Sequence, residues 1–202
     1  MGRRFALLAA VAIVTGCATG PRPTLVDTPP VADPGSLEVL NLMAGADSAE
    51  FTASYLIFTK FGGATTPAVV TQSGSRRSIT VGHTRFLVDG ERTATCDLIE
   101  ASCESGINDA AISDVQVTHQ FWSRAMENRL RTDANRSIGP GTVTDYSVAG
   151  LTARCVAVPV VGGDKSYCAL PSGVLAGYDG ADLTIDLVTY EDRADESLLA
   201  TR

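Results

Sequence analysis

The chain has 202 residues and a formal net charge of −7 at pH 7, and 45% of its residues are hydrophobic but only 6% aromatic. The negative balance argues against nucleic acid as a partner and against electrostatic adhesion to anionic lipid head groups. The length that follows the N-terminal leader suits one domain.

The N-terminus has the anatomy of an export signal. Arg3 and Arg4 precede an apolar run at residues 5–14, which is too short to span a bilayer. The run ends in "VTGC", which resembles the bacterial lipobox, where the signal is cut before a cysteine that then carries a lipid. The resemblance implies lipidation of Cys17 and an exported protein anchored on the outer side of the bacterial cell membrane. The alternative is an ordinary secretory signal cut elsewhere, with Cys17 incidental.

Three parts follow from this leader. We expect residues 1–16 to be the lipoprotein signal peptide, and residues 17–35 to be the lipidated cysteine with a proline-rich spacer. Such a spacer favours extended conformations and lacks the apolar residues of a core. Residues 36–202 then form a single domain.

Four further cysteines predict two disulfides, because an even number in an exported domain is typical of cross-links. Three connectivities are possible, and local pairing is favoured because Cys96 with Cys103, and Cys155 with Cys168, bracket expected hairpins. Without a Cys-x-x-Cys motif the sequence supports neither a redox dithiol nor a zinc site.

Strands dominate the expected secondary structure. A short helix is expected first, with Ser36 as its N-cap. The strand at 51–61 carries bulky residues on both faces near its centre, so both faces should need cover. Glycine-bearing turns separate the expected strands, which lie at residues 51–61, 68–72, 77–81, 84–88 and 92–98, and then at 143–148, 151–158, 166–169, 174–176 and 182–190.

A long helix is expected between the two groups of strands, at residues 107–134. Its bulky residues recur every three or four positions, which is the period of one helix face. Ser113 and Gln116 form the expected capping box. The stripe comprises Ile112, Val115, His119, Trp122, Met126 and Leu130.

Catalytic motifs are missing. His83 lies in an expected turn and His119 on the apolar stripe, and no serine or cysteine motif accompanies either histidine. Asp179 and Asp182 lack the spacing of a calcium loop, and no glycine motif fits phosphate. We therefore expect no enzyme, no cofactor and no metal. An envelope hydrolase is the competing hypothesis, and it would need a catalytic cluster near His83 or His119.

The order of elements resembles the LolA/LprG-like family. The resemblance covers roughly residues 36–192 and depends on "FTASYLIF", on "RRSITVGHTRFLVDG" and on the C-terminal strands from "VAGLTARCVAVPV" to "DLTIDLVTY". Its members include lipoprotein carriers, glycolipid-handling lipoproteins and RseB-like regulators. The resemblance implies an α+β fold, in which helices cover the concave face of a strongly curved, unclosed antiparallel half-barrel.

The resemblance also implies an apolar space between helix and sheet. A lipid or glycolipid ligand would occupy it, for transport or presentation. The residues expected to line it are Phe51, Tyr55, Ile57, Phe86, Val88, Trp122 and Met126. The alternative is that these side chains meet in a filled core, and that the domain is an RseB-like sensor that binds an envelope membrane protein.

Overall fold

The computed structural model describes residues 30–200, so the expectations for the signal peptide and for Cys17 lie outside the described residues. From Val31 onward the described chain forms one unit. Within this part of the chain, no helix is both long enough and apolar enough to cross a membrane.

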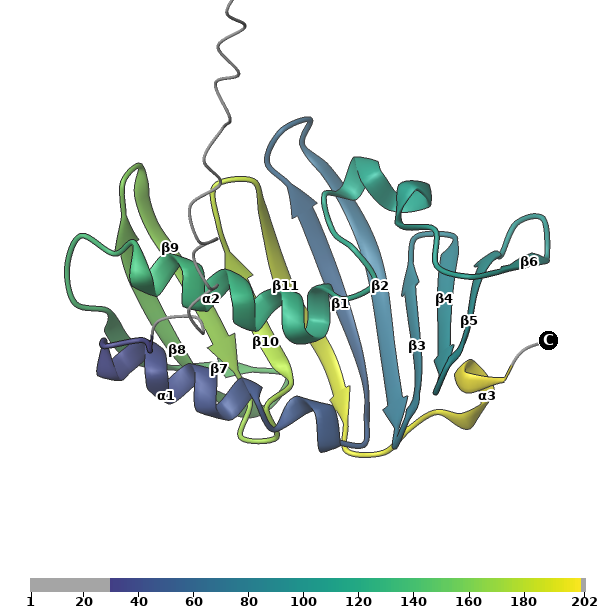
Figure 1. Ribbon diagram of the computed structural model, residues 1–202, viewed down its shortest axis with the longest axis horizontal. Helices are drawn as coiled ribbons and strands as arrows, with labels where there is room; N and C mark the ends of the chain where they lie inside the picture. Colours follow the sequence, from purple (N-terminus) through teal and green to yellow (C-terminus); the bar gives the residue numbers. More distant parts are fainter. Residues whose placement is uncertain (1–29, 201–202) are drawn as a thin grey trace, which may run out of the picture. The chain divides into compact units, whose positions relative to one another are not determined.

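One antiparallel sheet of eleven strands organises the domain, in the order β6-β5-β4-β3-β2-β1-β11-β10-β9-β8-β7 (Figure 1). Two meanders meet in its middle, where β1 pairs with β11. The strands are β1 (Phe51–Thr59), β2 (Ala64–Ser73), β3 (Arg76–Val81), β4 (Thr84–Asp89), β5 (Arg92–Asp97), β6 (Ser102–Ser105), β7 (Thr142–Val148), β8 (Leu151–Val160), β9 (Gly163–Ala169), β10 (Leu175–Asp179) and β11 (Leu183–Glu191).

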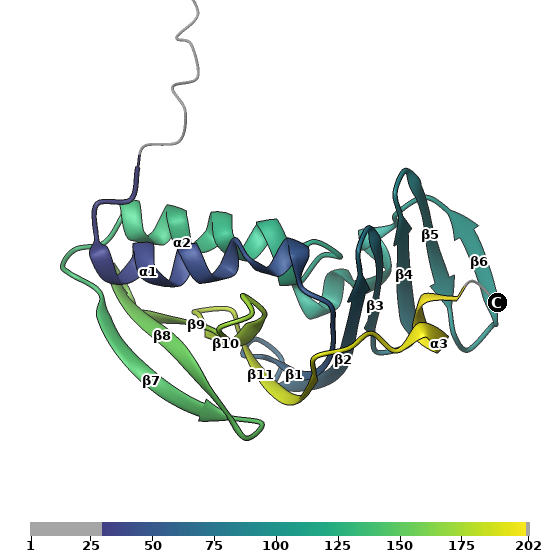
Figure 2. The same cartoon turned by 90° about the horizontal axis from the view of Figure 1, so that it is seen from below.

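The sheet is curved and does not close, because β6 and β7 remain edge strands. Figure 2 shows α1 (Pro34–Met43) and α2 (Met126–Asn135) side by side on the concave face. The expected unclosed half-barrel with helices on its concave face is confirmed. A short third helix, α3 (Glu196–Leu199), packs near β2 and β3 and was not expected from the sequence.

Alternation along β1 explains which of its side chains are covered. Tyr55 and Ile57 are buried on the concave face, whereas Leu56 and Phe58 point to the convex face and are exposed. Bulky residues therefore lie on both faces of this strand, as the sequence indicates, but the domain covers only the concave one. A bulge between Ser54 and Tyr55 shifts the register against β11, so that Val188 and Thr189 both stand opposite this bend.

Helix α1 begins earlier than expected. Asp33 is its N-cap, and its carboxylate accepts a hydrogen bond of 2.7 Å from the backbone N–H of Ser36. Pro34 occupies the first turn, where a missing N–H costs nothing. The same carboxylate accepts a 3.0 Å bond from the N–H of Gly141, where a Cβ would lie 2.7 Å from Asp33 Oδ2. Ser36 is therefore not the cap but a buried residue of the first turn.

The single helix expected at 107–134 is wrong. A 3₁₀ turn (Asp109–Val115) and a π-helical turn (Phe121–Ala125) precede α2. Gln116 adopts a left-handed φ of 62°, so it ends a turn and does not belong to a capping box with Ser113. The helix is broken because a side chain binds a backbone group that a helix would use. The Asp109 carboxylate accepts a hydrogen bond of 2.7 Å from the backbone N–H of His119. The spacing of the apolar residues still identifies the buried side chains, because every residue of the stripe except His119 is buried.

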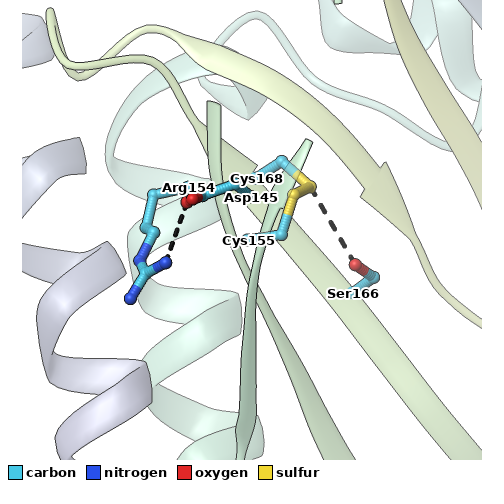
Figure 3. The surroundings of a disulfide bond; sticks show 5 residues. All are labelled: Asp145, Arg154, Cys155, Ser166 and Cys168. Carbon is cyan, nitrogen blue, oxygen red and sulfur yellow. Dashed lines mark hydrogen bonds and ion pairs between the residues drawn. A yellow bond between two sulfur atoms is a disulfide. The ribbon is translucent and has the colours of Figure 1, made fainter. Parts of the chain in front are cut away.

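Both expected disulfides are present. Cys96 and Cys103 face each other across β5 and β6, and Cys155 and Cys168 across β8 and β9, each pair with Cα atoms 4.0 Å apart. Around the second disulfide, Ser166 lies beside the sulfur of Cys168, while Arg154 points away toward the helices (Figure 3).

Candidate functional site

The residues expected to line a ligand cavity all belong to the concave face or to the segment above it. Six of them are buried and Val88 is half-buried. The same six belong to one continuous hydrophobic core. The Tyr55 ring lies 5.7 Å from that of Trp122, whereas Phe86 lies 6.0 Å from His119, and Phe51 stacks on Tyr190 at 6.4 Å.

The space beside Trp122 is almost filled. The void there measures about 10 Å³ and is lined by Met43, Ala46, Trp122, Met126, Gly173 and Leu175. Pockets for small molecules usually measure about 300 to 1,000 Å³. Tyr55 closes the layer from the sheet side, since its hydroxyl donates to the Leu175 carbonyl at 3.0 Å. In this conformation the interior has no room for an acyl chain beside Trp122.

A buried polar cluster holds α2 against the sheet. The Asp133 carboxylate accepts hydrogen bonds from the Tyr167 hydroxyl and from Lys165 Nζ, the latter at 2.8 and 3.0 Å. Asp133 is 6% exposed and Tyr167 is fully buried. Burial, and then the hydrogen bond to the carboxylate, raise the pKa of the Tyr167 hydroxyl. These hydrogen bonds replace those that the buried groups would make to water. Since moving α2 would break them, they fix its position on the sheet.

A second polar contact holds α2 one turn earlier. Arg129 Nη1 donates to the Tyr178 hydroxyl at 2.9 Å and to the Asp182 carboxylate at 3.0 Å, and its guanidinium lies 5.3 Å from the Tyr178 ring centre. Burial alone would lower the pKa of Arg129, but the hydrogen bonds to Tyr178 and Asp182 outweigh it, so that this pKa is raised. The guanidinium also lies 5.5 Å from the ring of Phe121. Arg129 thus ties α2 to Tyr178 of β10 and to the turn before β11, and Phe121 of the π-helical turn packs against the same tyrosine.

Sequence patterns gave no sign of a role for Arg77. Its side chain points to the concave face, where Nη2 donates to the Trp122 carbonyl at 3.0 Å. Burial lowers the pKa of this guanidinium. An arginine in a strand with period-two alternation carries no signal of its own, so this contact with the π-helical turn was missed.

Comparison with known proteins supports the fold. The solved structure of MucB covers 83% of this chain with a TM-score of 0.50 at 11% identity. The Pseudomonas aeruginosa MucA/MucB complex gives 0.49 over 82% of this chain at 13% identity. This chain spans only 62% and 61% of those two matched chains.

Two shorter proteins match as well. LprF from Mycobacterium bovis gives a TM-score of 0.41 at 12% identity, over 79% of this chain and 95% of that one. A LolA superfamily protein from Nitrosomonas europaea gives 0.39 at 11% identity, over 81% and 97%. No family model matches the sequence, and no curated protein does. The fold is that of the LolA/LprG/RseB-like half-barrels.

The two histidines occupy different parts of the half-barrel. His83 is exposed in the turn between β3 and β4. His119 Nδ1 lies 2.9 Å from Asp109 Oδ2, and this carboxylate also accepts from the His119 backbone. The pair therefore closes the loop of residues 109–119, in which the His119 ring lies 6.0 Å from that of Phe86.

The convex face of the half-barrel carries an exposed apolar cluster, of which the sequence indicated the bulky residues on the strand at 51–61 but not their neighbour on β11. Leu56, Phe58 and Val188, which we call the convex cluster, are 43%, 41% and 48% exposed. Leu56 stands opposite Asp186 in the register of β1 with β11, so Val188 is its diagonal neighbour. Burial, and then repulsion from Asp179, raise the pKa of Asp186. The cluster thus has a carboxylate at its centre.

Proposed function

We propose that this chain is a lipid-anchored protein of the bacterial cell envelope whose half-barrel binds another protein and catalyses no reaction. Cys17 would hold it on the outer side of the membrane. The observation that favours a protein partner over a lipid is the nearly filled space between α2 and the sheet, where the void measures about 10 Å³. A carrier of acyl chains needs a space there that is tens of times larger.

The filled interior has specific polar contacts, which argues against a loosely covered pocket. Trp122 lies in the turn that leads directly into α2, and α2 is held on the sheet through Asp133 and Arg129, so a lipid that displaces α2 from beneath must break these contacts. Asp133 is 6% exposed, and leaving it unpaired costs about 3 to 5 kcal/mol, whereas Arg129 and Asp182 are 33% and 35% exposed and their pair contributes less. The closed arrangement therefore suits a fixed scaffold better than a carrier that opens in each cycle.

The convex cluster is the surface on which a partner would dock. Leu56, Phe58 and Val188 lie on the central strands β1 and β11, and the carboxylate of Asp186 lies among them. A polypeptide segment with apolar side chains and one or more lysines or arginines would complement this surface. MucB, whose fold this chain shares, has been solved in complex with MucA. Lipid binding remains the competing hypothesis for the same fold.

Site-specific photocrosslinking in the native cells tests the proposal. A photoreactive residue placed at Phe58 in the full-length protein should give one discrete protein adduct. The matched control is Ile138, which is 69% exposed in the connection between α2 and the edge strand β7, whereas the convex cluster lies on the central strands. Asp186→Lys should abolish the Phe58 adduct by reversing the charge at the centre of the cluster. Equal adducts from Phe58 and Ile138, or an adduct that Asp186→Lys leaves unchanged, would refute docking at this surface.

Native mass spectrometry of the full-length protein tests the competing lipid hypothesis. We expect no lipid adduct that depends on Trp122, because the void beside this residue is so small. A non-covalent lipid mass that survives gentle purification, and that a folded Trp122→Lys variant lacks, would contradict the filled-core argument and favour the carrier.

A further inference from the structure

A second cavity lies on the convex face, away from α2, between α3 and the end of the sheet that β4, β5 and β6 form. It measures about 420 Å³. Its floor includes Leu87 and the Cys96–Cys103 disulfide, and Leu98 and Leu198 contribute to its walls. The volume lies within the range of about 300 to 1,000 Å³ that is usual for small-molecule sites. Nothing in the concave arrangement or the convex cluster uses this space.

The cavity combines apolar walls with one cation. Arg85 lines it, and Arg85 Nε donates to the Thr80 hydroxyl at 3.3 Å. Among residues 30–200 no carboxylate forms an ion pair with Arg85. A guanidinium has five N–H donors in a planar fork that fits carboxylate or phosphate. Arg85 therefore keeps donors for an anion from outside the domain.

The acidic residue that borders the cavity does not compete for Arg85. Asp97 follows Cys96 in β5, so strand alternation turns its side chain to the opposite face. Its carboxylate accepts hydrogen bonds from the backbone N–H groups of Ile99 and Glu100 at 2.7 and 3.0 Å. It is thus engaged in its own turn.

The wall formed by α3 is held in place. Arg76 forms two hydrogen bonds of 2.8 Å with the Glu196 carboxylate, from Nη1 and Nη2. Asp195 caps the helix through the N–H of Ser197, and its own N–H donates to the Thr52 hydroxyl at 2.8 Å. These contacts preform the cavity, so a ligand need not pay for ordering the helix on entry.

We propose that this cavity binds a small amphiphilic anion, with the anionic head group at Arg85 and the apolar part against Leu87, Leu98 and Leu198. The head group can be a carboxylate or a phosphate monoester, since both match the guanidinium fork. This site is distinct from the proposed docking surface and does not depend on it.

Isothermal titration of the full-length protein with decanoate, decyl phosphate and decanol tests the proposal. We expect saturable binding of at least one of the two anions, and this result also identifies the head group. Decanol should bind at least about tenfold more weakly, because it lacks the charge-assisted hydrogen bonds to Arg85. Arg85→Met keeps most of the apolar stem and should weaken the anion about tenfold with little effect on decanol.

Two further variants separate the site from a general effect of charge or folding. Arg92→Met removes an exposed arginine from the neighbouring strand and should leave binding unchanged. Leu198→Trp should block binding of all three probes by filling the cavity, while circular dichroism and melting temperature report an intact fold. The proposal is wrong if neither anion binds saturably. It is also wrong if Arg85→Met behaves like Arg92→Met, or if a folded Leu198→Trp variant binds as the parent does.

Discussion

The Asp133 cluster gives the sharpest test of what holds α2 on the sheet. In Asp133→Ala the Tyr167 hydroxyl, which is fully buried, loses its acceptor, and the Lys165 ammonium loses its anion. Removing one partner of a buried pair costs about 3 to 5 kcal/mol. The Lys165 side chain is 25% exposed, so water can solvate part of its charge and the lower end applies. We expect a loss of about 3 kcal/mol in the free energy of unfolding.

Urea denaturation and thermal melting of the full-length protein measure this loss. For a domain of this size each kcal/mol lowers the melting temperature by about 2 to 4 °C, so a decrease on the order of 10 °C is expected. Asp133→Asn is the control, because it keeps the shape and an acceptor but not the charge, and it should lose less.

A double-mutant cycle decides whether the cluster acts as a unit. Lys165→Met should cost much less in the Asp133→Ala background than in the parent, because the lysine then has no carboxylate to pair with. A loss below about 1 kcal/mol for Asp133→Ala, or simple additivity of the two changes, would refute the view that this cluster holds α2.

Three further outcomes are expected. Tyr55→Phe should cost about 1 to 2 kcal/mol in urea denaturation, because the buried Leu175 carbonyl loses its donor while the ring contacts remain, and a neutral result would contradict that hydrogen bond. Burial alone would raise the pKa of Asp182, but its hydrogen bond and charge interaction with Arg129 outweigh burial and lower it. The ionised carboxylate therefore stabilises the folded protein above about pH 4, and this contribution is lost as the pH falls through the lower pKa of the folded state. The melting temperatures of the parent and Asp182→Asn should therefore converge below about pH 4, and a constant difference down to pH 2 would contradict this linkage. Cys17→Ala should move the protein from the membrane to the soluble fraction, and retention on the membrane would exclude the lipid anchor.

Local sequence signals were sufficient for the hairpins. Cys96 and Cys103, or Cys155 and Cys168, are close in sequence and flank turns, so antiparallel pairing places each pair opposite without help from distant residues. The alternating burial along β11, with Leu183, Ile185 and Leu187 inside, likewise follows from local strand geometry. The class of fold followed from the family resemblance that the order of such segments carries.

The helical segment shows where local patterns stop. The period of three and four residues identified the buried side chains from Ile112 to Leu130, yet burial does not require one continuous helix. Asp109 binds the backbone and the ring of His119, and that contact breaks the helix at a place where propensity alone allowed it to continue. A side-chain hydrogen bond between residues ten positions apart can replace the backbone hydrogen bonds of a helix turn. The spacing of apolar residues contains no information about such a bond.

The nature of the site was decided only in three dimensions. The sequence identified Tyr55, Trp122 and Met126 as neighbours of one interior but could not tell a cavity from a core, because both need apolar residues at the same positions. The difference lies in how closely the side chains of α1, α2 and β10 interlock. The pairing of β1 with β11, from opposite ends of the domain, likewise brings Leu56 beside Asp186 and Val188. Such contacts depend on register and packing between segments more than a hundred residues apart, and no local pattern encodes them.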